Sequence, residues 1–410
     1  MTNRDVSDLP VDPPSMLDTA QTTPLDPTQP TPSRGPQTAA GLTAAQTGRT
    51  AHTAHTAQTA QTALQAAQAE FSPSGIYLNS ASLGLPPARS LTDLQRAVTH
   101  WQAGTADPPS YDRYVERSRE LYAALVGTAP ERVAIGSQVS AFVGLIAAAL
   151  PAGSEVLVVE GEFTSLVFPF LAQATRGVTV REVPLEDLAG SVSAATALVA
   201  VSAVQSADGR VADLDALVAA CAAHGARTLV DTTQAAGWLP VQADRYDYTV
   251  GGGYKWLLAP RGTAYFTVRP DLADGLIPHA AGWYAGAKPW ESIYGTPLRL
   301  SPEARRFDLS PAWHSWIGQA PALELLTEVG IETLHSHAVG LANRFRAGIG
   351  LGAGDSAIVS LAVTEGVPPA LKAAGIAGAF RAGRLRVGFH LYNTAEDADA
   401  AAEVIRALVR

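Results

Sequence analysis

Apolar and polar positions change their pattern near residue 70. After that point, short apolar runs alternate with stretches that have helical spacing. Seven runs predict strands: "RVAIG", "EVLVVEG", "VTVREVP", "TALVAVSAV", "RTLVDTT", "YDYTVGG" and "GTAYFTV". Several are apolar throughout, as expected when helices cover both faces of a sheet. The last two have no helix between them and could pair antiparallel. We therefore predict an α/β fold with a mostly parallel, mixed, seven-stranded sheet flanked by helices.

The pattern after about residue 320 predicts a smaller α+β domain. A long helical stretch (315–349) is followed by strands at 357–363 and 384–389 and by a final helix at 394–409. The predicted organisation is a large domain over 111–319 and a small C-terminal domain over 320–410. Residues 71–110 are expected to join the small domain.

Residues 1–70 contain no Phe, Tyr, Trp, Ile or Cys and include the repeat "TAHTAHTAQTAQTA". Such a segment buries too little apolar surface to offset the entropy lost on ordering. We predict a disordered, low-complexity tail whose end, "TALQAAQAE", could form a frayed helix. His52 and His55 lie in the repeat and are interpreted as solvated residues, so no metal site is predicted.

Composition narrows the class of protein. The 410-residue chain has a net charge of −9 and a pI near 5.5, which argues against nucleic acids and anionic membranes as partners. No apolar run approaches the roughly 20 residues needed to span a bilayer. The N-terminus lacks the basic start and apolar stretch of a signal peptide. A single cysteine, Cys221, excludes an intrachain disulfide. These features are typical of a cytoplasmic enzyme.

One lysine stands out because lysine is rare here, occurring only at positions 255, 288 and 372. Lys255 lies between glycines and an apolar run, where burial is expected, and an amine can condense with a carbonyl. A surface-directed lysine is the alternative. Asp231 closes an apolar strand, and Gln234 follows it; Asp231 could instead cap a helix. Because ligands bind beyond the carboxyl ends of strands in open α/β sheets, these side chains are expected to face one crevice.

The stretch "LVDTTQAAGWLPVQADRYDYTVGGGYKWLLAPRGTAYF" closely resembles the signature of class V aminotransferase-like enzymes of the fold-type I pyridoxal 5'-phosphate (PLP) group. Kynureninases, isopenicillin-N epimerases and cysteine desulfurases belong to that group. The resemblance implies that Lys255 forms a Schiff base with PLP, that Asp231 holds the pyridinium nitrogen and that Gln234 binds the phenolic oxygen. It also implies catalysis through external aldimine and quinonoid intermediates.

Further segments match the family's cofactor contacts. "AIGSQVSAF" resembles the phosphate cradle, which assigns Ser137, Gln138 and Val139 to phosphate binding. "VVEGEFTSLVFPF" places Phe163 where the family stacks a side chain on the pyridine ring.

Three other cofactor contacts follow from the resemblance. "VSAVQSADGRVADL" offers Gln205 or Ser206 on the substrate side of the cofactor, and alignment does not choose between them. Tyr254 occupies a phosphate-contacting position. Ser310 could reach the phosphate of a partner subunit.

The substrate-binding residues implied by the resemblance are Arg386, Asn79, Trp283 and His314. "RLRVGFHLYNTAEDADAAAEVI" places Arg386 where the family binds the substrate α-carboxylate, with Arg384 as the alternative. Trp283 and His314 lie in segments that cross a dimer interface in relatives. The resemblance therefore implies a homodimer acting on a small amino acid or amine.

An aminotransferase is the first interpretation of the reaction, and a PLP-dependent C–S or C–C lyase or an epimerase is the alternative. A persulfide on Cys221 is not expected, because this cysteine lies in a helical pattern. A nicotinamide dehydrogenase fits poorly, since "GIGLGAG" follows a helix and precedes a strand. A non-catalytic relative is also disfavoured. The sequence does not predict the substrate, the pathway or the role of the tail.

Overall fold

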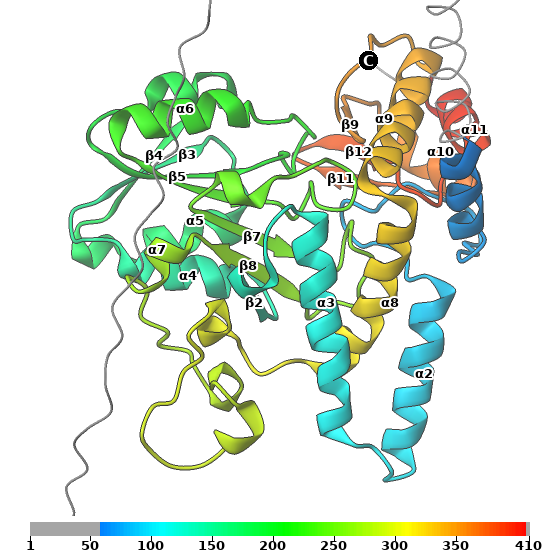
Figure 1. Cartoon of the computed structure of the whole chain (residues 1–410). Coiled ribbons are helices and arrows are strands. Elements are labelled where there is room, and N and C mark those ends of the chain that lie inside the picture. The colour runs from blue at the N-terminus through cyan, green and yellow to red at the C-terminus, as the bar shows by residue number, and fades with distance from the viewer. Residues whose placement is uncertain (1–57, 407–410) are drawn as a thin grey trace, which may run out of the picture. The chain divides into compact units, whose positions relative to one another are not determined.

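The computed structural model describes residues 58–406, whose central element is a seven-stranded sheet (Figure 1). In chain order the strands are β2 (Val133–Gly136), β3 (Glu155–Val159), β4 (Thr179–Val183), β5 (Thr196–Ser202), β6 (Arg227–Asp231), β7 (Tyr248–Gly252) and β8 (Ala264–Val268). Their order across the sheet is β2-β8-β7-β6-β5-β3-β4. Strand β8 runs antiparallel to β2 and β7, whereas the other neighbours are parallel. The predicted mixed, mostly parallel sheet is confirmed.

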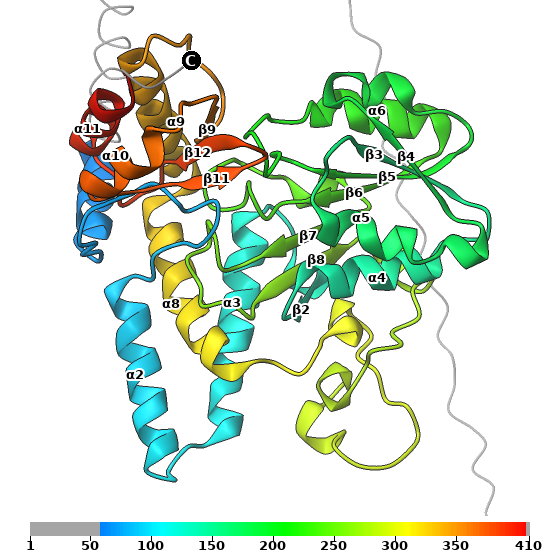
Figure 2. The ribbon, with the colours of Figure 1, turned by 180° about the vertical axis from the view of Figure 1, so that it is seen from behind.

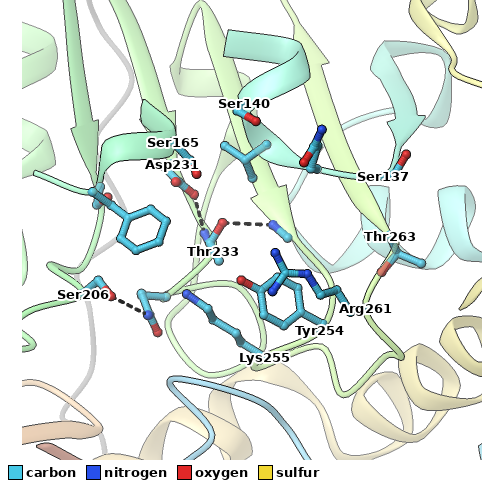
Figure 3. A pocket seen from close by; sticks show the side chains of 16 residues that line it. Ser137, Ser140, Ser165, Ser206, Asp231, Thr233, Tyr254, Lys255, Arg261 and Thr263 are labelled. Atoms are coloured by element: carbon cyan, nitrogen blue, oxygen red, sulfur yellow. Dashed lines mark hydrogen bonds between the residues drawn. The ribbon is translucent and has the colours of Figure 1, made fainter. Parts of the chain in front are cut away.

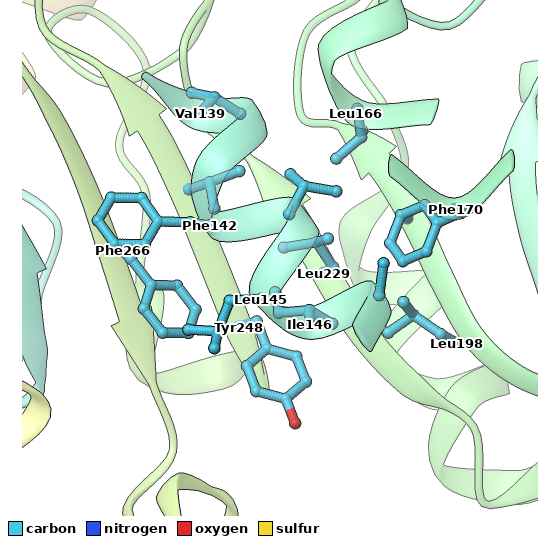
Figure 4. Close-up of a cluster of buried hydrophobic side chains, with 14 of the residues drawn as sticks. Val139, Phe142, Leu145, Ile146, Leu166, Phe170, Leu198, Leu229, Tyr248 and Phe266 are labelled. Atoms are coloured by element: carbon cyan, nitrogen blue, oxygen red, sulfur yellow. The ribbon is translucent and has the colours of Figure 1, made fainter. Parts of the chain in front are cut away.

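Helices cover both faces of this sheet because its strands are apolar on both sides. The covering helices are α4 (Val139–Ala149), α5 (Thr164–Leu171), α6 (Leu214–His224) and the short α7 (Pro270–Ala273). In β3, Val156 and Val158 belong to one core cluster with residues of α4 and α5, and Leu157 and Val159 belong to another with residues of α6. Figure 4 shows part of the first cluster, including Phe142 of α4 and Phe170 of α5. Each buried Val, Leu or Phe of these clusters contributes roughly 1.5–3 kcal/mol.

A second, three-stranded antiparallel sheet lies in the C-terminal part (Figure 2). Its strands are β11 (Ala379–Arg381), β12 (Arg384–Gly388) and β9 (Ile358–Leu361), in that order. Leu385 and Val387 pack into a core with α9 (Ile331–Gly348), α10 (Val367–Ala373) and α11 (Ala395–Arg406). Because strand side chains alternate, Arg384 and Arg386 lie on the opposite face of the sheet.

The N-terminal part of the described chain joins this C-terminal region. Strand β1 (Ile76–Tyr77) pairs in parallel with β10 (Ile376–Ala377), and Leu78 belongs to the same core. Helix α8 (Trp313–Val329) packs against α2 (Ala88–Gln102) and α3 (Asp112–Leu125). The predicted domain boundaries stay predictions.

Residues 58–68 form a helix, and Leu64 and Ala67 are buried in a core that includes Tyr392. The helix expected at the end of this segment, "TALQAAQAE", is therefore present, whereas the disorder predicted up to residue 70 is wrong for residues 58–68, because their apolar positions have a surface to pack on. Residues 1–57, including His52 and His55, lie outside the described part of the chain. None of the helices in residues 58–406 is long and apolar enough to cross a membrane.

A buried ion pair connects two distant segments near the sheet. Arg119 of α3 donates to both carboxylate oxygens of Asp308, at 3.2 and 2.7 Å, and Asp308 also accepts from the backbone N–H of Ile135 at 2.8 Å. Both charged side chains are almost fully buried. The pair fixes the end of β2 just before Ser137.

Candidate active site

A pocket of about 620 Å³ lies at the carboxyl ends of β5, β6 and β7, where Ser202, Asp231 and Gly252 line it (Figure 3). The predicted cofactor residues that the structure brings together in this pocket are Ser137, Gln138, Val139, Phe163, Ser206, Asp231, Gln234, Tyr254 and Lys255. The predicted position beyond the strand ends is therefore where the pocket lies.

The amine of Lys255 is buried without a hydrogen-bond acceptor among the described residues. The residue is 5% exposed, and Nζ lies 5.2 Å from the centre of the Phe163 ring and 5.6 Å from that of Tyr254. Burial lowers the pKa of Lys255 to about 8, against the opposing charge of Asp231, and the charge of Arg386 adds to the lowering. At pH 7 about a tenth of the amine is therefore unprotonated and nucleophilic, far more than for a lysine with an ordinary pKa.

The backbone around Lys255 is held closely on several sides. A Cβ at Gly84 would lie 2.0 Å from the carbonyl oxygen of Lys255, and one at Gly237 would lie 2.4 Å from that of Trp256. His390 Nδ1 accepts from the backbone N–H of Leu391, so its Nε2 carries the proton and donates to the Trp256 carbonyl at 2.9 Å. The lysine therefore lies on a rigid loop.

Asp231 is a buried carboxylate with no ion-pair partner among the described residues. It is 4% exposed, and its Oδ1 accepts from the Thr233 N–H at 2.8 Å. Burial raises the pKa of Asp231 to about 6, while the Thr233 bonds act to lower it. A buried carboxylate of this kind is stabilised by a cationic N–H donor, such as a pyridinium nitrogen.

The side-chain amide of Gln234 has a fixed orientation. The indole N–H of Trp256 donates to Oε1 at 2.8 Å, and an indole nitrogen can only donate. Nε2 therefore carries the donors on the other side, toward the Ala81 carbonyl at 3.0 Å and the Ser206 hydroxyl at 3.1 Å. Both N–H groups of the amide are thus in use, and Gln234 can donate to an acceptor such as a phenolic oxygen by exchanging its bond to the Ser206 hydroxyl.

One end of the pocket is suited to a phosphate. Helix α4 begins at Val139, its first N–H groups have no side-chain cap, and Ser137 and Ser140 line the pocket beside them. Arg261 lies over the Tyr254 ring at 5.1 Å and makes no ion pair with a described residue. This combination of helix N-terminus, hydroxyls and guanidinium is typical of anion binding.

The structure separates the two alternatives at Gln205 and Ser206. Gln205 does not line the pocket, because its amide donates to the buried Glu162 at 3.0 Å. Glu162 also accepts from the backbone N–H of Phe163 and from Ser202. Ser206 faces the pocket instead, and Phe163, which is 43% exposed, presents its ring there.

Arg386 is buried beside this pocket without a carboxylate partner. It is 2% exposed and donates through Nη1 to the carbonyl and hydroxyl of Ser206 and through Nη2 to the Ser82 hydroxyl at 2.9 Å. Its Nε has no partner among the described residues, and burial lowers the pKa of Arg386 to about 10. Arg384 instead bonds Ser360, so Arg386 is the better placed of the two for a carboxylate.

Besides Gln205, four further predicted residues lie outside the pocket of the single chain. Ser310 is exposed, and Trp283 packs against Tyr284 and Trp290. His314 packs against Trp101, with the ring centres 5.1 Å apart and the rings tilted by 40°. The backbone of Asn79 forms an isolated parallel β-bridge with Gly388, and the buried side-chain Oδ1 of Asn79 has no partner among the described residues.

Sequence reasoning missed several residues that line the pocket, among them Ser165, Ser202, Thr233, Arg261 and Thr263. The sequence contains one indication of Arg261, because it is the single cationic residue in the "PRG" that follows the loop of Lys255. Thr233 accepts from the Gly252 N–H at 2.9 Å, a contact that depends on the pairing of β6 with β7.

The described residues fit PLP at each of its polar groups. Asp231 suits the ring nitrogen, Gln234 the phenolic oxygen, Lys255 the aldehyde and the start of α4 the phosphate. Fold and pocket together define a fold-type I PLP-dependent enzyme. The Aminotransferase class-V family matches residues 97–354, which is more than half of the sequence. The chain belongs to the class V aminotransferase family, whose cofactor is PLP.

Known proteins similar to this chain have different activities. An uncharacterized aminotransferase of Bacillus subtilis is 29% identical, over 63% of this chain and 70% of its own length. The isopenicillin N epimerase of Amycolatopsis lactamdurans is 30% identical, over 48% of this chain and 60% of its own length. A solved cystine C–S lyase complex is 20% identical with a TM-score of 0.74, covering 82% of this chain and 98% of that one, and supports the fold alone.

Proposed function

We propose that this enzyme catalyses amino-group transfer from an α-amino acid, with Lys255, Asp231 and Arg386 as its principal residues. The observation that carries the proposal is the convergence of an unpaired buried amine and an unpaired buried carboxylate in one pocket, beside an unpaired buried guanidinium. Each of the three is costly to bury alone. Bound PLP and an amino acid would supply the missing partners.

The chain's own residues would hold and orient the cofactor. Asp231 would hold a proton on the ring nitrogen, and Gln234 would donate to the phenolic oxygen. The N–H groups at the start of α4, with Ser137 and Arg261, would bind the phosphate. When bound, PLP acts as an electron sink for a carbanion at the substrate α-carbon.

Lys255 and Arg386 would act on the substrate. Arg386 would bind the α-carboxylate through its guanidinium, which fixes the orientation of the bonds at the α-carbon. Lys255 Nζ, with a pKa of about 8, would take up the α-proton and deliver it to the carbon that was the cofactor's aldehyde carbon, which is the proton shift that amino-group transfer requires. Phe163 can pack on a ring but cannot transfer protons, so this role remains with Lys255.

A lyase or an epimerase is the second candidate. An epimerase is among the relatives, and so are kynureninases and cysteine desulfurases. Desulfuration through a protein persulfide is disfavoured, because Cys221, the only cysteine in the sequence, is 2% exposed in α6. Burial raises the pKa of this thiol to about 11.

The reaction is tested by incubating the holoenzyme with a panel of amino acids, with and without pyruvate or 2-oxoglutarate. We expect a new amino acid to form from the oxo acid, and only when the oxo acid is present. Release of ammonia or sulfide without an oxo acid would replace the aminotransferase by a lyase. Loss of optical purity alone would indicate an epimerase.

We also propose a homodimer, in which Ser310, Trp283 and His314 would reach the pocket of the second copy. Large apolar side chains exposed on α2 and on the 277–300 segment support it: Leu91 (51%), Trp101 (65%), Ile277 (74%), Tyr294 (87%) and Leu298 (79%). Sedimentation equilibrium tests the proposal, and a monomer at micromolar concentration would contradict it.

Trp256 is predicted to tune the cofactor through Gln234. Trp256→Phe removes the N–H that fixes the amide, so the amide can rotate and the phenolic oxygen loses a donor. We expect a rise of about one unit in the pKa at which the visible absorption of bound PLP changes, since a hydrogen bond to a charged group is worth about 1.5–3 kcal/mol. A spectrophotometric pH titration measures it.

Trp238→Phe is the matched control for this substitution. Both indoles are fully buried, but Trp238 donates to the backbone carbonyl of Gln234 at 2.6 Å and does not fix the amide. Its spectral pKa should stay at the wild-type value. Equal shifts of the spectral pKa in the two variants would mean that looser packing of the core around Gln234, and not the orientation of its amide, causes the change.

A further inference from the structure

Three arginines lie on one face of the small C-terminal sheet. In the β11–β12 hairpin Arg381 pairs with Arg384 and Ala379 pairs with Arg386, and directly opposed residues share a face. Arg381, Arg384 and Arg386 are therefore neighbours. The other face carries Leu385 and Val387 and is covered by the C-terminal core.

No carboxylate of the described residues neutralises this face. Arg384 bonds the side chain and carbonyl of Ser360, and Arg381 bonds the Phe380 carbonyl at 2.8 Å. Opposed like charges destabilise a strand pair. Three guanidiniums without an acid leave this face available to an anion from outside the chain.

Arg381 and Arg386 are the two that converge. The hydroxyl of Ser82 accepts from Arg386 Nη2 at 2.9 Å and from Arg381 Nη2 at 3.4 Å, so these nitrogens are no further apart than the two distances combined. The charge of Arg381 also contributes to the lowered pKa of both Lys255 and Arg386. Arg381 thus belongs to the electrostatic surroundings of the pocket.

The two residues differ in depth. Arg386 is buried beside Ser206, whereas Arg381 is exposed at the end of the hairpin, next to a tight turn in which Ala382 (φ 46°) and Gly383 (φ 72°) both have positive φ. In both ribbon views the hairpin points from the C-terminal part toward the loops that follow the large sheet (Figures 1 and 2). Arg381 therefore lies at the protein surface and Arg386 below it, beside the pocket residue Ser206.

We propose that Arg381 binds a second acidic group, so that the substrate is an amino acid with a carboxylate on its side chain. The proposal rests on the proposed function, in which Arg386 binds the α-carboxylate. The closeness of the two guanidiniums fits a short dicarboxylic amino acid, whose carboxylates are separated by a few carbon atoms. Ser82 keeps both guanidiniums in place when no substrate is bound.

Calorimetric titration of the full-chain holoenzyme with glutarate and pentanoate tests the proposal. These five-carbon acids differ by one carboxylate and lack an amine, so binding is measured without turnover. We expect glutarate to bind about tenfold more tightly than pentanoate, as a charged hydrogen-bonded contact provides. Arg381→Gln should weaken glutarate by about three- to tenfold and leave pentanoate within about twofold. The difference should shrink at high salt, because Arg381 is exposed.

Arg384→Gln is the matched control, since it removes the same charge from the same face without touching Ser82. It should leave the ratio of the two affinities unchanged. Arg386→Gln should weaken both acids; if it weakens neither, the proposed carboxylate site is wrong. If Arg386→Gln behaves as expected but Arg381→Gln affects neither acid, or both equally, the second acidic contact is refuted while the proposed function stands.

Discussion

Lys255→Ala is expected to abolish turnover and to eliminate the covalent bond between protein and cofactor. Loss of proton transfer alone would slow the reaction by about 10²–10⁴-fold, and loss of the covalent attachment adds to it. Borohydride reduction followed by peptide mass spectrometry measures the attachment directly. The reduced adduct should be found on Lys255 in the wild type and should be absent from the variant.

The matched control is Lys372→Ala, since Lys372 is an exposed lysine in the last turn of α10. It should retain both the adduct and turnover. The rate of covalent attachment to the wild-type apoenzyme should rise as the pH increases through about 8, because the unprotonated amine is the nucleophile. An adduct on another lysine, or an attachment rate that does not change over this range, would contradict the assignment of Lys255.

The large sheet was the most predictable part of the fold. Continuous apolar runs at β3, β5 and β6 are buried on both faces, and such runs specify parallel strands under helices almost independently of the rest of the chain. Our predictions contained no element for α2 and α3. Much of α3 is polar, so its sequence does not show an apolar face clearly. Arg119, for example, lies on the buried side of the helix, and only its pairing with Asp308 in the folded structure explains why an arginine is buried there.

The site was predictable where it follows strand ends. Asp231 ends the buried strand β6 and Lys255 lies three residues beyond the end of β7, so their positions follow from the sheet. Ser82 and Ser206 meet Arg386 only when segments about 300 and 180 residues away are packed together. The orientation of Gln234 likewise depends on Trp256, a residue that reads as plain core. Contacts between distant segments produce no pattern in the local sequence. The choice between Gln205 and Ser206 therefore depends on the three-dimensional structure.

Asp308→Ala is predicted to destabilise the protein strongly. The substitution leaves the buried Arg119 guanidinium with only the partly exposed Glu116 as a counter-charge, and it leaves the Ile135 N–H without its acceptor. Breaking a buried pair from one side typically costs about 3–5 kcal/mol. Urea unfolding of the apoenzyme, followed by tryptophan fluorescence, should show this loss as a lower midpoint. Asp399→Ala is the control, because it breaks the exposed Arg344–Asp399 pair and should change stability little.

The double variant Arg119→Met, Asp308→Leu separates charge burial from the contact itself. If the cost in Asp308→Ala is that of a buried charge that Glu116 alone compensates poorly, removing both charges should recover much of the lost stability. Cofactor affinity should not recover to the same extent, because the N–H of Ile135 still lacks the acceptor that fixes the end of β2 before Ser137. Equal recovery of stability and PLP affinity would mean that the pair supports the fold but does not position the phosphate loop. Recovery of stability alone would show that one carboxylate stabilises the fold and also positions the cofactor site.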